Sequence, residues 1–198
     1  MKISVVSSDG GEYSCNVYLV TGSSNAIGDV NTLVDVGRDP GIIEKILLAS
    51  TGVGKKRVEQ VVLTHSHFDH ASLLPEIRSR FSPKVCAASP FLEGVDVILK
   101  GGEQIRMGDR DFEVIATPGH SSDSLCFFCP KDGILFAGDS PLTIMTGEGT
   151  YEPGFVHALE TLCTKDIKSI YFGHGKPLLE GVDRILKESL RNVRKSVR

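Results

Sequence analysis

The stretch Thr64-His65-Ser66-His67-Phe68-Asp69-His70-Ala71 decides how the rest of this sequence is interpreted. It holds three of the six histidines of the 198-residue chain. Imidazole nitrogens and carboxylate oxygens are ligands that suit zinc and other first-row divalent cations. In an extended chain the first two histidines project to the same side, and the aspartate and third histidine reach a neighbouring point once the chain turns. The stretch therefore predicts a loop that serves two adjacent metal ions.

This loop and three further ligand-type residues follow predicted strands. The segment before the loop, residues 58–63, is a short β-branched run typical of a buried strand. The further residues are His120 after residues 111–116, Asp139 after 133–137 and His174 after 169–172. A glycine beside each lets the backbone approach closely. His157 lies in a predicted helix without this context, so we interpret it as a surface or supporting residue.

Composition places the chain among ordinary globular proteins. It has 22 Lys and Arg against 25 Asp and Glu, a net charge of −3, and 40% hydrophobic residues. This length predicts one domain over residues 1–198 with a sizeable core. The apolar content excludes a disordered chain, and no apolar run approaches the roughly 18 residues that a membrane span needs.

The charge distribution argues against a nucleic-acid partner. The basic run lies in a predicted C-terminal helix, residues 178–197, whose apolar residues follow helical spacing. Its cations are Arg184, Lys187, Arg191, Arg194, Lys195 and Arg198. We interpret them as a solvated helix face, so the expected partner is a small molecule.

The five cysteines are an odd number and are scattered, which does not indicate a disulfide framework. They favour a reducing, cytoplasmic environment. Cys126 and Cys129 form a CxxC pattern, but they lie in a strand-like run. Positions three apart on a strand face opposite sides, so this pair is expected to be buried rather than metal-binding. The N-terminal residues 1–6 predict a strand rather than a signal peptide.

Strands and helices are mixed along the chain, with runs of consecutive strands. The predicted strands are 3–6, 15–21, 32–36, 58–63, 84–87, 104–107, 111–116, 124–129, 133–137 and 169–172, and the predicted helices 42–49, 73–80, 155–163 and 178–197. This order predicts sheets with helices packed on their outer faces.

With these motifs the sequence resembles the metallo-β-lactamase-fold hydrolases, near the glyoxalase II-like branch. The resemblance rests on Thr64–His70, Thr117-Pro118-Gly119-His120, Gly138-Asp139 and Gly173-His174, which occur in the family's order and cover essentially the whole chain. Asp35 is similar to the family's first motif, a carboxylate that supports a ligand without being one. The resemblance implies an α+β fold, a four-layer αββα sandwich with the metals at one edge between the sheets.

The resemblance also implies a ligand set for two divalent metal ions, with zinc expected first and iron or manganese as alternatives. The first ion would be held by His65, His67 and His120, the second by Asp69, His70 and His174, and Asp139 would bridge them. Asp69 would in addition hold and pass on a proton during catalysis. His67 argues against the oxygen-reducing di-iron branch, which carries Glu there. Asp139 argues against antibiotic hydrolysis, because lactamases of this fold lack the bridging carboxylate.

Several positions depart from individual branches. Glyoxalase II usually continues with a Gly-Gly pair after the third histidine, whereas this chain has Ala71-Ser72-Leu73. Only 24 residues (198 − 174) follow His174, too few for that enzyme's C-terminal glutathione-binding helical domain. Quorum-signal lactonases usually have a Tyr shortly after the bridging Asp, and Ser140-Pro141-Leu142-Thr143 contains none. The chain thus resembles the catalytic core alone.

The expected activity is hydrolysis of an ester, thioester or lactone by a metal-activated water. One alternative is a persulfide-dioxygenase-like oxidoreductase with a single iron at His65, His120 and Asp139, which leaves His70 and His174 without a ligand role. A phosphodiesterase or nuclease of the same fold is another, but it needs a basic groove. A structural zinc site is disfavoured because such sites are typically Cys-rich. The substrate stays open, since its pocket would come from loops such as 89–94 and 141–154.

Overall fold

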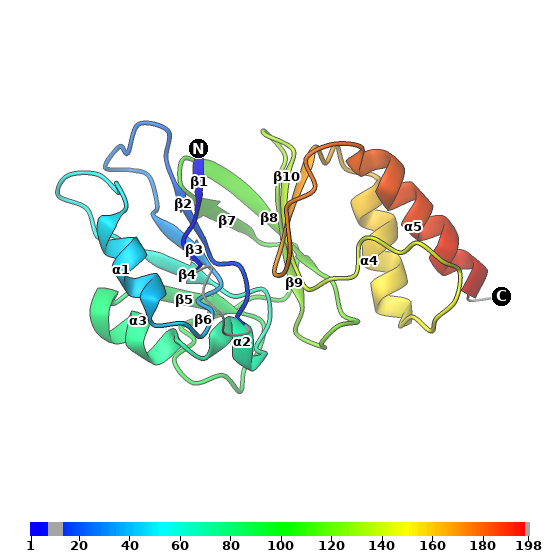
Figure 1. The fold of residues 1–198 in the computed structure, drawn as a ribbon, viewed down its shortest axis with the longest axis horizontal. Helices are drawn as coiled ribbons and strands as arrows, with labels where there is room; N and C mark the ends of the chain where they lie inside the picture. The colour runs from blue at the N-terminus through cyan, green and yellow to red at the C-terminus, as the bar shows by residue number, and fades with distance from the viewer. Residues whose placement is uncertain (8–13, 197–198) are drawn as a thin grey trace.

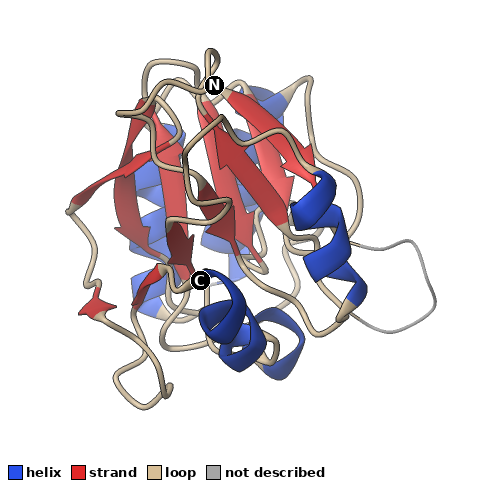
Figure 2. Cartoon of the chain, turned by 90° about the vertical axis from the view of Figure 1, so that its left-hand side faces the viewer, coloured by secondary structure: helices blue, strands red, loops and turns tan. Residues whose placement is uncertain are grey.

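The chain folds into two β-sheets that face each other, with helices on the outer face of each (Figure 1). A computed structural model describes residues 1–7 and 14–196. Helices α1 and α3 lie on one side of the pair of sheets and α4 and α5 on the other, and Figure 2 shows the strands from a perpendicular direction. The predicted α+β class and four-layer αββα arrangement are therefore confirmed.

The first sheet has the order β1-β2-β3-β4-β5-β6. Its strands are β1 Lys2–Val5, β2 Tyr18–Thr21, β3 Thr32–Val34, β4 Gln60–Val62, β5 Lys84–Ala87 and β6 Val97–Ile98. Strands β1 to β3 pair antiparallel, and β3 to β6 pair parallel. Because β3 and β4 run the same way, Asp35 and the histidine-rich loop that follow them emerge at the same edge.

The second sheet has the order β11-β10-β9-β8-β7. Its strands are β7 Gln104–Met107, β8 Arg110–Ala116, β9 Leu125–Cys129, β10 Ile134–Gly138 and β11 Ser169–Phe172. β9 is antiparallel to both β8 and β10, and β11 is parallel to β10. β8, β10 and β11 therefore share one direction, and the residues after them, His120, Asp139 and His174, meet at one edge.

The helices are α1 Gly41–Leu48, α2 Phe68–Ala71, α3 Leu74–Phe81, α4 Pro153–Cys163 and α5 Val182–Ser196. All but the single turn of α2 cover the outer faces through apolar side chains. Ile42, Ile46 and Ile77 of α1 and α3 join the buried cluster of the first sheet, and Leu159 and Leu186 of α4 and α5 join that of the second. The basic residues of α5 are exposed, as the helical spacing predicted.

Alternate residues of the strands divide the core into separate layers. On β9, Cys126 and Phe128 pack toward α4 and α5, whereas Phe127 and Cys129 pack between the sheets. The prediction that the two cysteines face opposite sides is therefore confirmed. All five cysteines lie in the described part of the chain, and all are free thiols.

Several details differ from the sequence prediction. The strands predicted at 15–21, 32–36 and 58–63 are shorter, at Tyr18–Thr21, Thr32–Val34 and Gln60–Val62. The last helix begins at Val182 rather than 178, because Leu178 pairs with Ile170 in an isolated bridge and Gly181 turns the chain at a φ of +67° before the helix starts. Val197 and Arg198 lie outside the described residues. The short elements β6 and α2 were not predicted, since two and four residues are too few for a periodic signal.

Among residues 1–7 and 14–196, no helix is long and apolar enough to cross a membrane.

The layer between the sheets predicts a large stability effect at Phe127, which is fully buried there. We expect Phe127→Ala to lower the free energy of unfolding by about 3–5 kcal/mol, because it leaves a cavity between two rigid sheets. Val53→Ala is the control, since this side chain is fully exposed and its loss should change stability by less than about 0.5 kcal/mol. Urea denaturation measures both, and equal midpoints would contradict the packing described.

Candidate metal centre

The seven predicted ligand residues lie at the edge where the two sheets meet. Backbone hydrogen bonds join the sheets there: Leu125 N–H donates to the Thr64 carbonyl over 2.7 Å, and Asn16 N–H to the Gly173 carbonyl over 2.6 Å. The loop after β4 brings four of the seven residues, and the ends of β8, β10 and β11 bring one each. The site is therefore assembled from both sheets.

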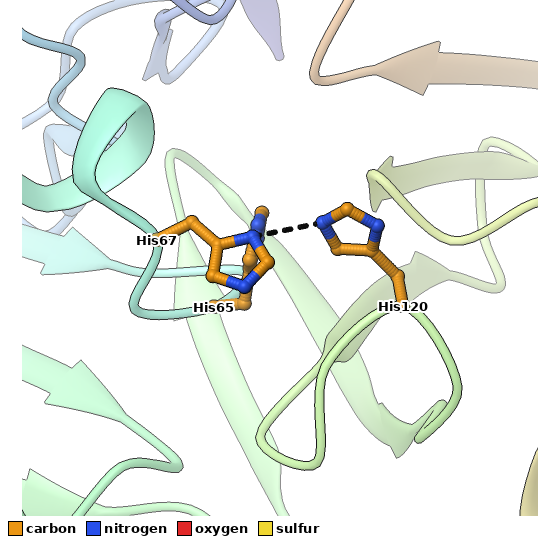
Figure 3. A group of neighbouring side chains, drawn as sticks. All are labelled: His65, His67 and His120. Atoms are coloured by element: carbon orange, nitrogen blue, oxygen red, sulfur yellow. Dashed lines mark hydrogen bonds between the residues drawn. The ribbon is translucent and has the colours of Figure 1, made fainter.

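Three histidines form the first group. His65, His67 and His120 each offer a ring nitrogen, and these atoms lie within 4.8 Å of one another. His67 Nδ1 is 2.9 Å from His120 Nε2. Figure 3 shows the three rings facing one another, with His120 reaching across from the loop after β8. His65 is buried, whereas the other two are exposed, so the group opens to solvent on one side.

The second group combines two carboxylates and two histidines. Ligand atoms of Asp69, His70, Asp139 and His174 also lie within 4.8 Å of one another. His174 Nε2 is 3.0 Å from Asp69 Oδ2, and His70 Nε2 is 3.3 Å from Asp139 Oδ1. Asp69 and His70 belong to the single turn of α2, which places both side chains at the site.

Asp139 adjoins both groups. Its Oδ2 lies 3.5 Å from His120 Nε2 of the first group and 3.5 Å from His174 Nε2 of the second. A carboxylate in this position has one oxygen within reach of ligands from each group. The geometry suits a carboxylate shared between two neighbouring cations.

Asp35 holds the loop from behind. Its carboxylate accepts hydrogen bonds from the Thr64 backbone N–H over 2.7 Å and the Thr64 hydroxyl over 2.8 Å. It also lies 2.9 Å from His70 Nδ1. With Nδ1–H donated to Asp35, the lone pair of His70 Nε2 points at the site, the arrangement that supporting carboxylates impose on metal-binding histidines.

The donor set fits a bound cation. The structure buries His65 Nε2, His70 Nε2 and Asp139 Oδ1 without a hydrogen-bond partner among the described residues. Leaving such a buried atom unpaired costs about 1–3 kcal/mol, so three that converge need an explanation. Coordination of divalent metal supplies one, because imidazole nitrogen and carboxylate oxygen are both ligand types.

Burial and the carboxylates set opposite protonation tendencies at the two buried histidines. Burial lowers the pKa of His65 to about 4, which keeps its imidazole neutral. Burial also disfavours a charged His70, but the carboxylates of Asp35 and Asp139 outweigh it and raise the pKa of His70. Burial opposes ionisation of Asp139, but contact with His70 prevails and lowers its pKa. A cation held at His70 Nε2 would therefore displace a proton from this ring.

Glycines let the backbone close on the site. Gly138 has a φ of +51°, and a Cβ there would lie 2.5 Å from Thr64 Oγ1. A Cβ on Gly173 would lie 2.2 Å from Asp139 Oδ1 and 2.6 Å from His70 Cε1. Only a residue without a side chain fits at these two points.

A family comparison agrees with this geometry. The model of the metallo-beta-lactamase superfamily matches residues 10–174, which include all seven residues. The chain belongs to the metallo-beta-lactamase superfamily.

Curated relatives of this superfamily member are named hydroxyacylglutathione hydrolase. The protein of Rhodopseudomonas palustris is 32% identical over 124 residues, covering 60% of this chain and 49% of the relative. That of Maricaulis maris is 33% identical over 124 residues, covering 59% and 48%. The chain spans about half the length of the curated relatives it matches.

Solved structures share the metallo-beta-lactamase fold at low identity. ETHE1 from Myxococcus xanthus aligns with a TM-score of 0.72 at 21% identity, covering 97% of this chain and 88% of its own. BJP-1, a subclass B3 metallo-beta-lactamase of Bradyrhizobium japonicum, gives 0.70 at 20% identity, covering 98% and 90%. Both likenesses concern the fold alone.

Some residues around the site carried no clear sequence signal. Thr64 was part of the decisive stretch, but its place between Asp35 and His65 depends on pairing between strands far apart in the chain. Cys15 was counted only as one of five scattered cysteines, yet its Sγ lies within 4.8 Å of ligand atoms of Asp35 and His70. His157 lies exposed on α4 and in neither group.

The packing at Gly173 predicts a selective effect on the site. We expect Gly173→Ala to displace Asp139 or His70, to lower the metal retained per chain and to cost about 1–3 kcal/mol of stability. Gly28→Ala is the control, because its Cβ would have no atom within 4 Å. Elemental analysis after dialysis and urea denaturation measure both effects. Full metal retention in Gly173→Ala would contradict the close packing.

Asp35 yields a second prediction. Asp35→Asn keeps the size of the side chain but removes the charge that orients His70, so metal affinity should fall about 10- to 100-fold. Asp166→Asn, at a side chain that is 83% exposed, makes the same change of charge on the surface and should leave affinity unchanged. Competition with a chromogenic chelator measures both, and equal affinities would show that Asp35 does not support the ligand.

Proposed function

We propose that this protein is a metal-dependent hydrolase that uses a dinuclear centre to cleave an ester, thioester or lactone. Residues 1–198 would form one catalytic domain, with a small molecule as the substrate. The names of the curated relatives support hydrolysis. The dinuclear assignment rests on this chain's own residues.

The observation that carries the proposal is the position of Asp139. One oxygen of this carboxylate lies 3.5 Å from a histidine of each ligand group. In the proposed assignment His65, His67 and His120 hold the first ion, Asp69, His70 and His174 hold the second, and Asp139 bridges them. A single ion would use only part of this set.

Bound metal ions would supply a water whose pKa falls from about 16 toward 7 and a Lewis acid for the substrate carbonyl. The chain's part is to orient and to move protons. Asp139 and the histidines fix the reacting centre, and Asp35 keeps His70 in the required orientation. The exposed side of the first group, at His67 and His120, leaves an approach for substrate.

Asp69 is the residue we assign to proton transfer. Its Oδ2 lies 3.0 Å from His174 Nε2 and 3.7 Å from His70 Nε2, so the carboxylate stays within the second group. Water adds its oxygen to the carbonyl carbon, Asp69 takes the proton, and the bond to the leaving oxygen or sulfur breaks. The proton then passes to that leaving group, which closes the balance without a Ser or Cys nucleophile.

The rival activities account for fewer of the observations. A mononuclear iron site at His65, His120 and Asp139 leaves His70 and His174 unused, although both contact Asp139. A nuclease needs cations along its substrate channel. The cavities that open on His120 and Asp139 have no Lys or Arg among their described lining residues.

The donor chemistry supports a choice of metal, and the free thiols support a compartment. We propose zinc, because neutral imidazole and carboxylate suit it, with iron or manganese accepted by the same donors. The five free thiols support a reducing, cytoplasmic location.

The ligand assignment makes a direct prediction at His67. We expect His67→Ala to lose metal and to lower kcat/KM more than about 100-fold, beyond the loss typical for a merely supporting residue. His157→Ala removes the one histidine outside both groups and should leave metal content and turnover unchanged. Metal analysis and a panel of thioesters and lactones measure both. An unchanged rate with full metal content in His67→Ala would overturn the assignment.

A further inference from the structure

A cavity of about 500 Å³ opens beside the proposed centre. His120 and Asp139 form one end of it. The rest is lined by residues that are not proposed metal ligands: Gly119, Pro141, Thr150, Tyr151, Glu152 and Phe155. A smaller cavity of about 230 Å³ shares His120, Asp139 and Pro141 with it. The cavity therefore leads from His120 and Asp139 along the start of α4.

The start of α4 is fixed against the loop that carries His120. A Cβ on Gly119 would lie 3.1 Å from Phe155 Cβ, and one on Gly154 would lie 2.8 Å from Pro118 Cγ. Phe155 is buried, and its ring stacks with Tyr151 at a centroid distance of 5.9 Å and an angle of 29°. The cavity wall is thus an aromatic pair packed closely against the loop of His120, a proposed ligand.

The charge of the cavity is negative away from the centre. Glu152 is the N-cap residue of α4, but its side chain makes no capping hydrogen bond. It is exposed. A helix N-terminus would otherwise favour an anion at this place, and the Glu152 carboxylate opposes that effect. Among the described residues that line the two cavities, none is Lys or Arg.

We propose that this cavity selects substrates whose group beside α4 is uncharged and apolar or aromatic, and that Glu152 excludes carboxylates. This inference rests on the proposed hydrolase function and adds its substrate class. Tyr151 and Phe155 supply the apolar contact, and like-charge repulsion from Glu152 supplies the discrimination. Glutathione carries two carboxylates, and away from the proposed metal centre it meets no Lys or Arg among the described residues that line these cavities, so a glutathione thioester is a poor substrate.

The test uses two thioesters of N-acetylcysteamine that differ only in charge. One carries a 4-carbamoylphenylacetyl group and the other the isosteric 4-carboxyphenylacetyl group. The metal-loaded wild-type protein should hydrolyse the neutral thioester with a kcat/KM about tenfold or more above that of the anionic one. Because repulsion at an exposed site is screened, the ratio should shrink as salt rises.

Glu152→Gln is the decisive variant. It should reduce the ratio of the neutral to the anionic kcat/KM by about three- to tenfold, mainly by lowering the KM of the anionic thioester. Glu148→Gln is the matched control, because it makes the same change of charge on an exposed residue of the same loop that lines neither cavity. It should leave the ratio as in the wild type.

Tyr151 tests the aromatic wall separately. A third substrate, the acetyl thioester of N-acetylcysteamine, lacks the aromatic ring. Tyr151→Ala should raise the KM for the neutral 4-carbamoylphenylacetyl thioester about two- to tenfold and should change hydrolysis of the acetyl thioester little. Tyr151→Phe retains the ring and should behave as the wild type. Equal effects of Tyr151→Ala on the 4-carbamoylphenylacetyl and acetyl thioesters would show that the Tyr151 ring does not contact the acyl group.

Binding of the corresponding unreactive primary amides, followed by ligand-observed NMR, distinguishes failure of the cavity assignment from failure of the hydrolase proposal. If no thioester is hydrolysed but the neutral amide binds better and Glu152→Gln removes that preference, the cavity assignment holds and the hydrolase proposal fails. If thioesters are hydrolysed with no charge preference, or Glu152→Gln matches Glu148→Gln, the cavity assignment is overturned and the hydrolase proposal stands.

Discussion

The carboxylate of Asp35 is the interaction on which the site depends. It joins the end of β3 to the loop after β4 through Thr64 and to α2 through His70. Asp35 itself has a φ of +59°, a conformation that is uncommon outside glycine and is tolerated best by Asp and Asn. Such strain persists only where surrounding contacts hold it. Here those contacts are three polar groups that orient the proposed ligands, and the Thr64 carbonyl continues the connection to Leu125 in the second sheet.

The sequence predicted the parts of this arrangement that depend on residues close together in the chain. The spacing from His65 to His70 and the position of His120, Asp139 and His174 after strands were readable, because a strand end places its next residue at a sheet edge. The two-residue period of a strand likewise predicted that Cys126 and Cys129 face opposite sides of the sheet. Local pattern could not reveal that Leu178 bridges Ile170 instead of continuing a helix, since that depends on a partner in another element.

The residues that line the cavity beside the centre also depend on contacts between distant elements, which local sequence pattern does not reveal. Tyr151 and Glu152 precede a helix in a loop that carried no recognisable motif. They matter because Phe155 packs on Gly119 and so brings the start of α4 to the loop of His120. Contact between residues more than thirty positions apart decides which side chains face the substrate. The proposed ligands therefore follow the ends of strands, whereas the residues proposed to select the substrate lie at the start of α4.

This separation explains how one fold combines opposite electrostatic demands. Divalent cations at the proposed centre would make it positive, which favours the carbonyl oxygen and any negative charge that develops there. Glu152 lies at the other part of the cavity and acts on the far end of the same molecule. Because Coulomb interactions weaken with distance and with solvent exposure, each end responds mainly to its own neighbours. A change at Glu152 therefore alters which substrate is preferred without altering the donors that would hold the metal.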